Sequence, residues 1–191
     1  MAHALNQRQR TLLLAAVAVL ALLAVTAVGL LLHDKAMVTD FSRKNLPPSL
    51  AYPFGTDWMG RDMLSRTLTG LSLSIRIGVL TAAVSAVVAL ALGTAAATLG
   101  RWVDAALSWC IDLVMGIPHI LLVMLISLAF GKGFVGVVAG VSLSHWTSLA
   151  RLLRGEVLQL RNAPYVLMAE KLGRTRLQVV RDHMLPHLLP Q

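Results

Sequence analysis

Four long stretches of the chain carry almost no charge, which makes them candidates for helices that cross a lipid bilayer. A hydrocarbon core about 30 Å thick needs about 20 apolar helical residues. The stretches are Thr11–Leu32, Ile77–Leu99, Leu113–Gly131 and Phe134–Ala150. The first is longer than the apolar core of a signal peptide, about 7–15 residues, so we interpret it as an uncleaved anchor. The pattern predicts an all-α, polytopic membrane helix bundle with four transmembrane helices.

Small residues recur every fourth position in the second and fourth stretches. Such stripes let helix backbones approach closely, although chance also produces them in Ala-rich helices. The two stripes are Ser85, Ala89, Gly93 and Ala97, and then Gly136, Gly140, Ser144 and Ser148. We expect these stripes to mark the faces on which the two helices pack. Gly131 and Gly133 predict a tight turn between the third and fourth spans.

The connection between the first two spans, about residues 33–74, is too long for a simple turn. Thr56 or Asp57 is expected to cap the helix that follows, with Asp62 in its first turns, where the helix dipole favours negative charge. From Met63 the apolar positions keep a helical spacing. The pattern predicts an interfacial helix that leads into the second span, and an ordinary solvated loop with a capped helix explains it equally well.

The last 41 residues, from Arg151, are the least membrane-like part of the chain. Pro164 suits the first turn of a helix, and Gly173 suits a left-handed cap at its end. Thr175 is expected to cap a second short helix that ends before Pro186. The composition permits either a pair of helices on the membrane surface or a docking site for another protein.

Composition excludes an ordinary soluble enzyme. Hydrophobic residues make up 57% of the 191 residues and charged residues 14%, against about 25% charged in soluble domains. The net charge of +8 is spread between the apolar spans, which argues against a nucleic-acid-binding face. The single cysteine, Cys110, excludes a disulfide scaffold or a cysteine metal cluster.

Lysine and arginine in the connections predict the orientation of the chain. With a cytoplasmic N-terminus, the inside segments carry ten of these residues and the outside segments seven. Because cytoplasmic segments of membrane proteins are enriched in Lys and Arg, we predict that the N-terminus lies inside.

Residues 55–66 and residues 165–186 form two blocks that resemble the transmembrane permease subunit of bacterial ABC importers in the peptide/nickel (dipeptide/oligopeptide/nickel) family. One runs from Tyr165 through Gly173 to Leu185-Pro186 and is similar to the cytoplasmic coupling loop of these permeases. Ser144-His145-Trp146 also fits the sequence pattern of this family. The other is the family's extracytoplasmic motif, which matches Gly55, Thr56, Asp57, Gly60, Arg61, Asp62, Ser65 and Arg66.

The resemblance implies an incomplete type I ABC importer permease fold. Residues 1–74 would form the anchor helix and an extracytoplasmic segment, and residues 75–191 a partial ABC transmembrane type-1 permease domain ending in the coupling loop. Family members continue through two more spans, so we expect the chain to be truncated before its last two transmembrane helices. Leu167 stands where the family usually has Glu, which, with Ser144-His145-Trp146, favours the nickel branch over the dipeptide branch.

The resemblance also implies a function. The subunit would form half of a translocation pathway for nickel, free or chelated, or for small peptides. Its expected partners are a second permease subunit in a heterodimer, two cytoplasmic ATPase subunits, an extracytoplasmic substrate-binding protein and membrane lipid, with no nucleic acid. It would be a multi-pass protein of the bacterial inner membrane. The residues expected to couple it to the ATPase are Pro164, Tyr165, Val166, Leu167, Ala169, Leu172 and Gly173.

No catalytic, cofactor or metal site is expected in the chain itself, and ATP would be bound by the partner subunits. Gly131-Lys132 is no phosphate loop, because Ile126 stands where a glycine is needed. Asp112, His119 and His145 are candidates for the translocation path, since ionisable residues in spans normally face protein or water. Asp112 also fits an ordinary helix edge, and each histidine fits a hydrogen-bonded packing role.

The competing interpretation is a stand-alone small membrane channel or scaffold protein with a basic cytoplasmic tail. It predicts neither an ATPase partner nor a substrate-binding protein.

Overall fold

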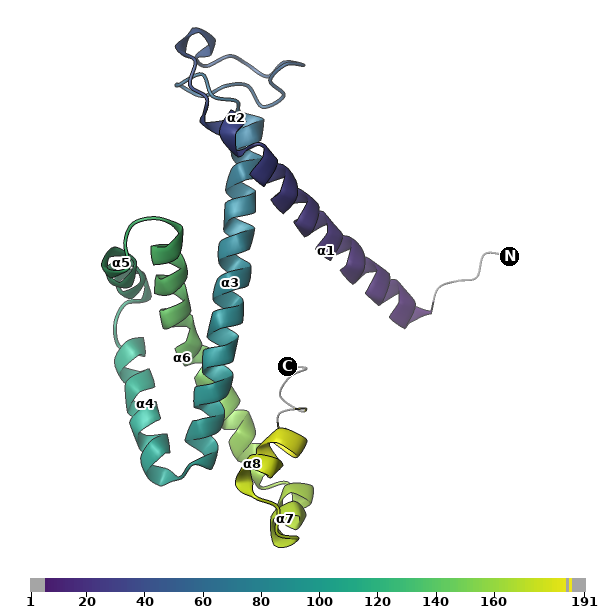
Figure 1. Ribbon diagram of the computed structural model, residues 1–191, viewed down its shortest axis with the longest axis vertical. Coiled ribbons are helices and arrows are strands. Elements are labelled where there is room, and N and C mark those ends of the chain that lie inside the picture. The colour runs from purple at the N-terminus through teal and green to yellow at the C-terminus, as the bar shows by residue number, and fades with distance from the viewer. Residues whose placement is uncertain (1–5, 185, 187–191) are drawn as a thin grey trace. The chain divides into compact units, whose positions relative to one another are not determined.

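The computed structural model describes residues 6–184 and 186, which form helices joined by short connections and one long loop. The chain divides into two compact units, Met1–Val79 and Leu80–Gln191. The long helix α3, Met63–Thr98, begins in the first unit and continues into the second (Figure 1). The expectation of an all-α fold is confirmed.

In the first unit, α1 (Gln7–Leu31) packs closely on the start of α3. Gly29 permits this approach, because a Cβ atom there would lie 2.4 Å from the carbonyl oxygen of Leu68. Two hydroxyl groups of α3 donate to carbonyl oxygens of α1: Thr69 Oγ1 to Gly29 at 3.2 Å, and Ser72 Oγ to Thr26 at 3.0 Å. These bonds fix the register of the two helices.

Between α1 and α3 lie a short helix, α2 (His33–Met37), a single 3-10 turn, η1 (Phe41–Arg43), and a loop. The expected cap at Thr56 or Asp57 is wrong, because Asp62 holds that position. Its Oδ1 accepts the backbone N–H of Leu64 at 3.1 Å. The interfacial helix and the second predicted span form one continuous helix, because no proline between Met63 and Leu99 removes a backbone N–H from the hydrogen-bond ladder.

In the second unit, α6 (Phe134–Arg161) packs against the later half of α3 and against α5 (His119–Ala129). A Cβ atom at Gly93 of α3 would lie 2.9 Å from the carbonyl oxygen of Ala150, and one at Gly140 of α6 would lie 2.7 Å from that of Val123. The prediction that small residues mark packing faces is confirmed at these glycines. The core between the helices comprises Ala89, Ile111, Trp146, Ala150, Leu153, Val157, Leu160, Val166, Ala169, Val179 and Met184.

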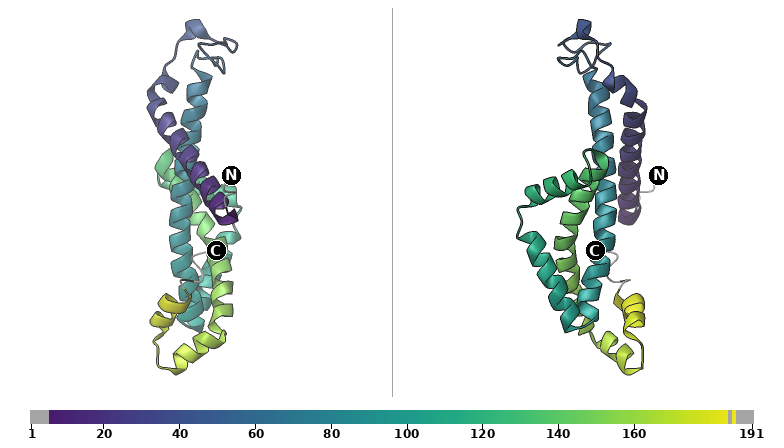
Figure 2. Two further views of the ribbon diagram at one scale, coloured as in Figure 1. Left: turned by 90° about the vertical axis from the view of Figure 1, so that its right-hand side faces the viewer. Right: turned by 60° about the vertical axis from the view of Figure 1, so that its left-hand side comes forward.

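The third predicted span, Leu113–Gly131, is wrong as a single straight helix. The chain instead forms α4 (Arg101–Met115) and α5, which meet at an angle of 96° (Figure 2). Pro118 explains the break, since it lacks a backbone N–H and disfavours helical backbone at the residue before it.

By length and composition, two helices of the described residues can cross a membrane, namely α1 and α3, or three if the bent pair α4–α5 forms one span. The fourth predicted span starts at Phe134 as expected, but its helix continues to Arg161. Polar residues in its middle, such as Ser144 and His145, make α6 less apolar than α1 and α3. The turn at Gly131–Gly133 is confirmed, and both glycines have positive φ.

The C-terminal segment matches the predicted start of its first helix, but the predicted stop before Pro186 is wrong, because Pro186 is itself in helical conformation. Helix α7 spans Pro164–Lys171, and Gly173 follows with a φ of 83°. Thr175 accepts the backbone N–H of Gln178 at 3.4 Å, and the Gln178 side chain accepts the backbone N–H of Thr175 at 2.9 Å. This reciprocal cap starts α8 (Arg176–Val179), which continues as a π-helical turn, η2 (Val180–Met184).

Candidate functional site

The eight residues of the extracytoplasmic motif come together in one folded loop of the first unit. Asp57 is its centre. Its Oδ1 accepts the backbone N–H groups of Met59 and Arg61, each at 2.9 Å. Its Oδ2 accepts Arg61 Nε at 2.8 Å and Arg66 Nη1 at 2.6 Å. One carboxylate therefore ties the turn to the first helical turn of α3.

The environment of Asp57 favours its charged form. Burial would raise its pKa, but hydrogen bonds from the backbone and side chain of Arg61 and from the backbone of Met59 outweigh that effect and lower the pKa to about 2. The carboxylate therefore stays ionised, and the loop stays braced, over the whole physiological pH range.

The remaining motif residues complete the same loop. Thr56 accepts the backbone N–H of Leu46 at 2.8 Å and donates to the carbonyl oxygen of Arg43. Asp62 accepts Ser65 Oγ at 2.7 Å and pairs with Lys35 Nζ at 3.1 Å. Gly55 and Gly60 both have positive φ, and a Cβ atom at Gly60 would lie 1.7 Å from the carbonyl oxygen of Asp40. These contacts show that the motif residues stabilise the fold of the loop.

The predicted ATPase-coupling residues, which run from Pro164 in α7 to Gly173 just after it, differ in exposure. Val166 and Ala169 are buried in the chain's own core. Tyr165, Leu167 and Leu172 are exposed, Leu172 to 81%. Met168, which is 66% exposed, was not among the predicted coupling residues. Its signal in the sequence is that of an apolar residue on a short helix outside the spans. An apolar face therefore remains uncovered within the described chain.

The residues after α7 hold its orientation. Arg174 donates its backbone N–H to the carbonyl oxygen of Ala169 at 3.1 Å, and its Nη1 pairs with Asp182 Oδ2 at 2.9 Å. A Cβ atom at Gly173 would meet no atom within 4 Å, so the positive φ alone favours glycine there. Glycine thus sets the angle between α7 and α8.

Of the three path candidates, the structure pairs Asp112 with Arg151 in an exposed ion pair between α4 and α6. A second pair joins the same two helices, with Arg154 Nη2 donating to Asp104 Oδ2 at 2.7 Å. Sequence reasoning missed these partners, although two acids on α4 and two arginines on α6 are visible in the sequence. Both pairs hold α4 alongside α6.

The structure brings the other two candidates together. The rings of His119 on α5 and His145 on α6 lie edge to face, with centroids 4.9 Å apart. His119 Nε2 also lies 3.0 Å from Ser144 Oγ. Among residues 6–184 and 186, no group of three or more His, Cys, Asp or Glu side chains is placed to hold a metal ion.

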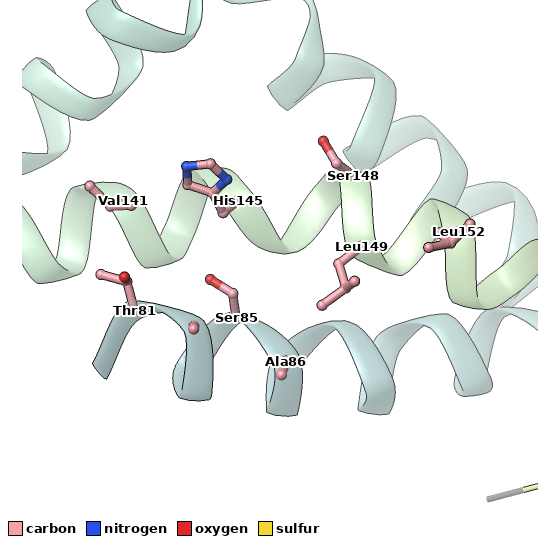
Figure 3. Close-up of a pocket in the computed structure, with 9 residues that line it drawn as sticks. Thr81, Ser85, Ala86, Val141, His145, Ser148, Leu149 and Leu152 are labelled. Atoms are coloured by element: carbon pink, nitrogen blue, oxygen red, sulfur yellow. The ribbon is translucent and has the colours of Figure 1, made fainter. Parts of the chain in front are cut away.

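Two pockets of the second unit adjoin this pair. One, of about 650 Å³, lies between α3 and α6 and includes His145, and another, of about 340 Å³, includes His119 and Ser144. Ser148 lines both. Figure 3 shows Thr81 and Ser85 of α3 facing α6, which carries His145. Hydroxyl and imidazole groups therefore line two pockets that are otherwise mostly apolar.

Comparison with known proteins identifies the class. Residues 87–191 match the family described as "Binding-protein-dependent transport system inner membrane component". The chain is 31% identical to the dipeptide transport system permease protein DppC of Bacillus subtilis (strain 168) over 169 residues, or 88% of this chain and 53% of that protein. It is 32% identical over 155 residues to the oligopeptide transport system permease protein OppC of the same organism, covering 78% and 51%. It is 32% identical over 158 residues to the probable D,D-dipeptide transport system permease protein DdpC of Escherichia coli (strain K12), covering 83% and 53%.

The chain belongs to this family of inner membrane components of binding-protein-dependent transport systems. It is a multi-pass inner-membrane protein. It spans about half the length of the curated relatives it matches. The family match begins at residue 87, inside the predicted permease domain of residues 75–191, and the boundary at residue 75 stays a prediction.

Proposed function

We propose that the chain forms half of the translocation pathway of an ABC importer for small peptides. The observation that carries this proposal is the uncovered apolar face of α7, in a chain of a binding-protein-dependent transport family. Tyr165, Leu167, Met168 and Leu172 would sit in a groove of a cytoplasmic ATPase subunit. The excess of Lys and Arg supports a cytoplasmic position for this segment and for the N-terminus.

The burial pattern supplies a mechanical route for coupling. Val166 is fully buried in a cluster that includes Val157 and Leu160 of α6. Because this cluster fixes α7 to α6, movement of a docked ATPase would move α6 as a rigid body. ATP would be bound and hydrolysed by two partner subunits, and this chain would take no chemical step.

A second permease subunit would face the pockets beside His145 and complete the pathway. A substrate-binding protein would deliver the cargo from outside. The peptide-permease names of the relatives support peptides as that cargo. The pattern Ser144-His145-Trp146 supports nickel, free or chelated, as the second candidate. The named relatives lend nickel no support.

Uptake measurements test the proposal. Cells that lack their own peptide and nickel permeases would express this chain with candidate ATPase, binding-protein and second permease subunits from its own organism. We expect uptake of a radiolabelled dipeptide that requires this chain and ATP. Uptake of radioactive nickel without dipeptide would assign the cargo to the nickel branch. Ion leakage that needs no ATPase would support the channel or scaffold interpretation instead.

A further inference from the structure

The contact between His119 and His145 has the dimensions of a metal-binding pair. Zinc-like ions bind imidazole nitrogen at about 2.0–2.1 Å, which places each ring centroid about 3.2 Å from the metal. Ligand angles of about 90–110° then separate two centroids by about 4.5–5.2 Å. The observed separation is 4.9 Å. Two rings that belong to different helices therefore lie at the distance that one shared ion requires.

Ser144 orients one of these rings. Its Oγ lies 3.0 Å from both His119 Nε2 and the carbonyl oxygen of Val141, so a hydroxyl that donates to Val141 accepts Nε2–H from the His119 tautomer protonated there. In that tautomer the lone pair of His119 is on Nδ1. Metal-binding histidines usually donate their second ring N–H in this way, which fixes the tautomer and the ring orientation. The serine is itself buried on α6, where Thr147 Oγ1 donates to its carbonyl oxygen at 3.0 Å.

The pair is also accessible. Both histidines are exposed within their unit, and each lines a pocket. Histidine in a membrane protein faces protein or a water-filled space, so an ion dissolved in water can reach these rings.

We propose that His119 and His145 form a two-imidazole site for a divalent transition-metal ion such as Cu²⁺, Ni²⁺ or Zn²⁺. Imidazole suits all three ions. Two ligands leave other positions open, and two neutral rings leave the charge of the ion uncompensated. The open positions therefore favour water or an anionic oxygen, such as a peptide carboxylate. This proposal concerns binding alone and does not depend on the transport function proposed above.

Copper binding to the purified full chain tests the site. The chain contains six histidines, so a background chain with His3, His33, His183 and His187 all replaced by alanine keeps only the two of interest. It is purified in detergent through a tag without histidine and titrated with Cu²⁺, which is followed by electron paramagnetic resonance. We expect one Cu²⁺ per chain with hyperfine coupling to two imidazole nitrogens.

Variants of this background separate ligand roles from structural ones. His119→Ala and His145→Ala should each leave one coupled nitrogen and weaken binding at least tenfold. Ser144→Ala should weaken binding about 10–100-fold and keep both nitrogens, because it removes only the orienting bond. Ser148→Ala, a serine on the same helix and in the same pockets, should bind like the background. A background chain with fewer than two coupled nitrogens, or unchanged binding after His145→Ala, overturns the proposal.

Discussion

Gly140 lets α5 and α6 approach each other more closely than a larger residue would allow without strain. A Cβ atom at this position would lie 2.7 Å from the carbonyl oxygen of Val123 and 3.2 Å from its Cγ1. The first contact must open to 3.4 Å to become ordinary, a shift of about 0.7 Å in a backbone atom. Overpacking of this kind costs about 1–3 kcal/mol. Gly140→Ala should therefore strain the contact between the two helices.

Gly155→Ala is the matched control, because Gly155 lies on the same helix and a Cβ atom there meets no atom within 4 Å. Replacing glycine by alanine inside a helix gains up to about 1 kcal/mol, and both variants share this gain. The difference between them is then the packing cost alone, about 1–3 kcal/mol.

Equilibrium unfolding in mixed micelles of dodecyl maltoside and SDS, followed by far-ultraviolet circular dichroism, measures that difference. We expect Gly155→Ala to unfold at the wild-type SDS fraction or above it, and Gly140→Ala clearly below the control. Equal unfolding midpoints for the two variants would refute the close approach of α5 and α6.

Three further predictions concern other parts of the structure. The lowered pKa of Asp57 stabilises the loop above about pH 4, and this stability is lost as the pH falls through about 2. Fluorescence of Trp58, in a chain whose other three tryptophans are replaced by phenylalanine, should show that transition. Asp57→Asn should abolish the transition. Val166→Ala should cost about 1–3 kcal/mol in the same unfolding assay, whereas Met168→Ala should stay within about 0.5 kcal/mol. Gly173→Val should abolish uptake by the assembled importer while leaving membrane insertion, measured by alkali extraction, intact; normal uptake would contradict a role for this glycine in coupling.

Features set by neighbouring residues could be predicted from the sequence. Pro164 begins α7, Gly173 follows its end in the left-handed conformation, and Thr175 caps α8, because each effect acts within a few residues. The same holds for the turn at Gly131–Gly133. Pro118, near the start of the third predicted span, is an equally local signal, but no bend between α4 and α5 was predicted from it.

Features set by the packing of separate helices could not be predicted. The periodicity of a helix relates residues three or four positions apart, whereas His119 and His145 meet only because the α5–α6 turn folds one helix back on the other. Periodicity likewise shows that α7 has apolar residues without showing that Val166 faces the chain's own core and Met168 faces outward. In the loop, the bond of Asp57 to Arg61 is local, and the bond to Arg66 depends on how α3 begins.

Co-purification shows whether the exposed apolar face of α7 docks on an ATPase. The chain is extracted in detergent with a candidate ATPase from its own organism, in its wild-type form and as Met168→Asp, Leu172→Asp and the control Gln159→Asp. Gln159 is exposed on the last turns of α6, outside the apolar face. We expect the wild type and the Gln159 variant to retain the ATPase and the Met168 and Leu172 variants to lose it. Retention by all four forms, or by none, would contradict docking through α7.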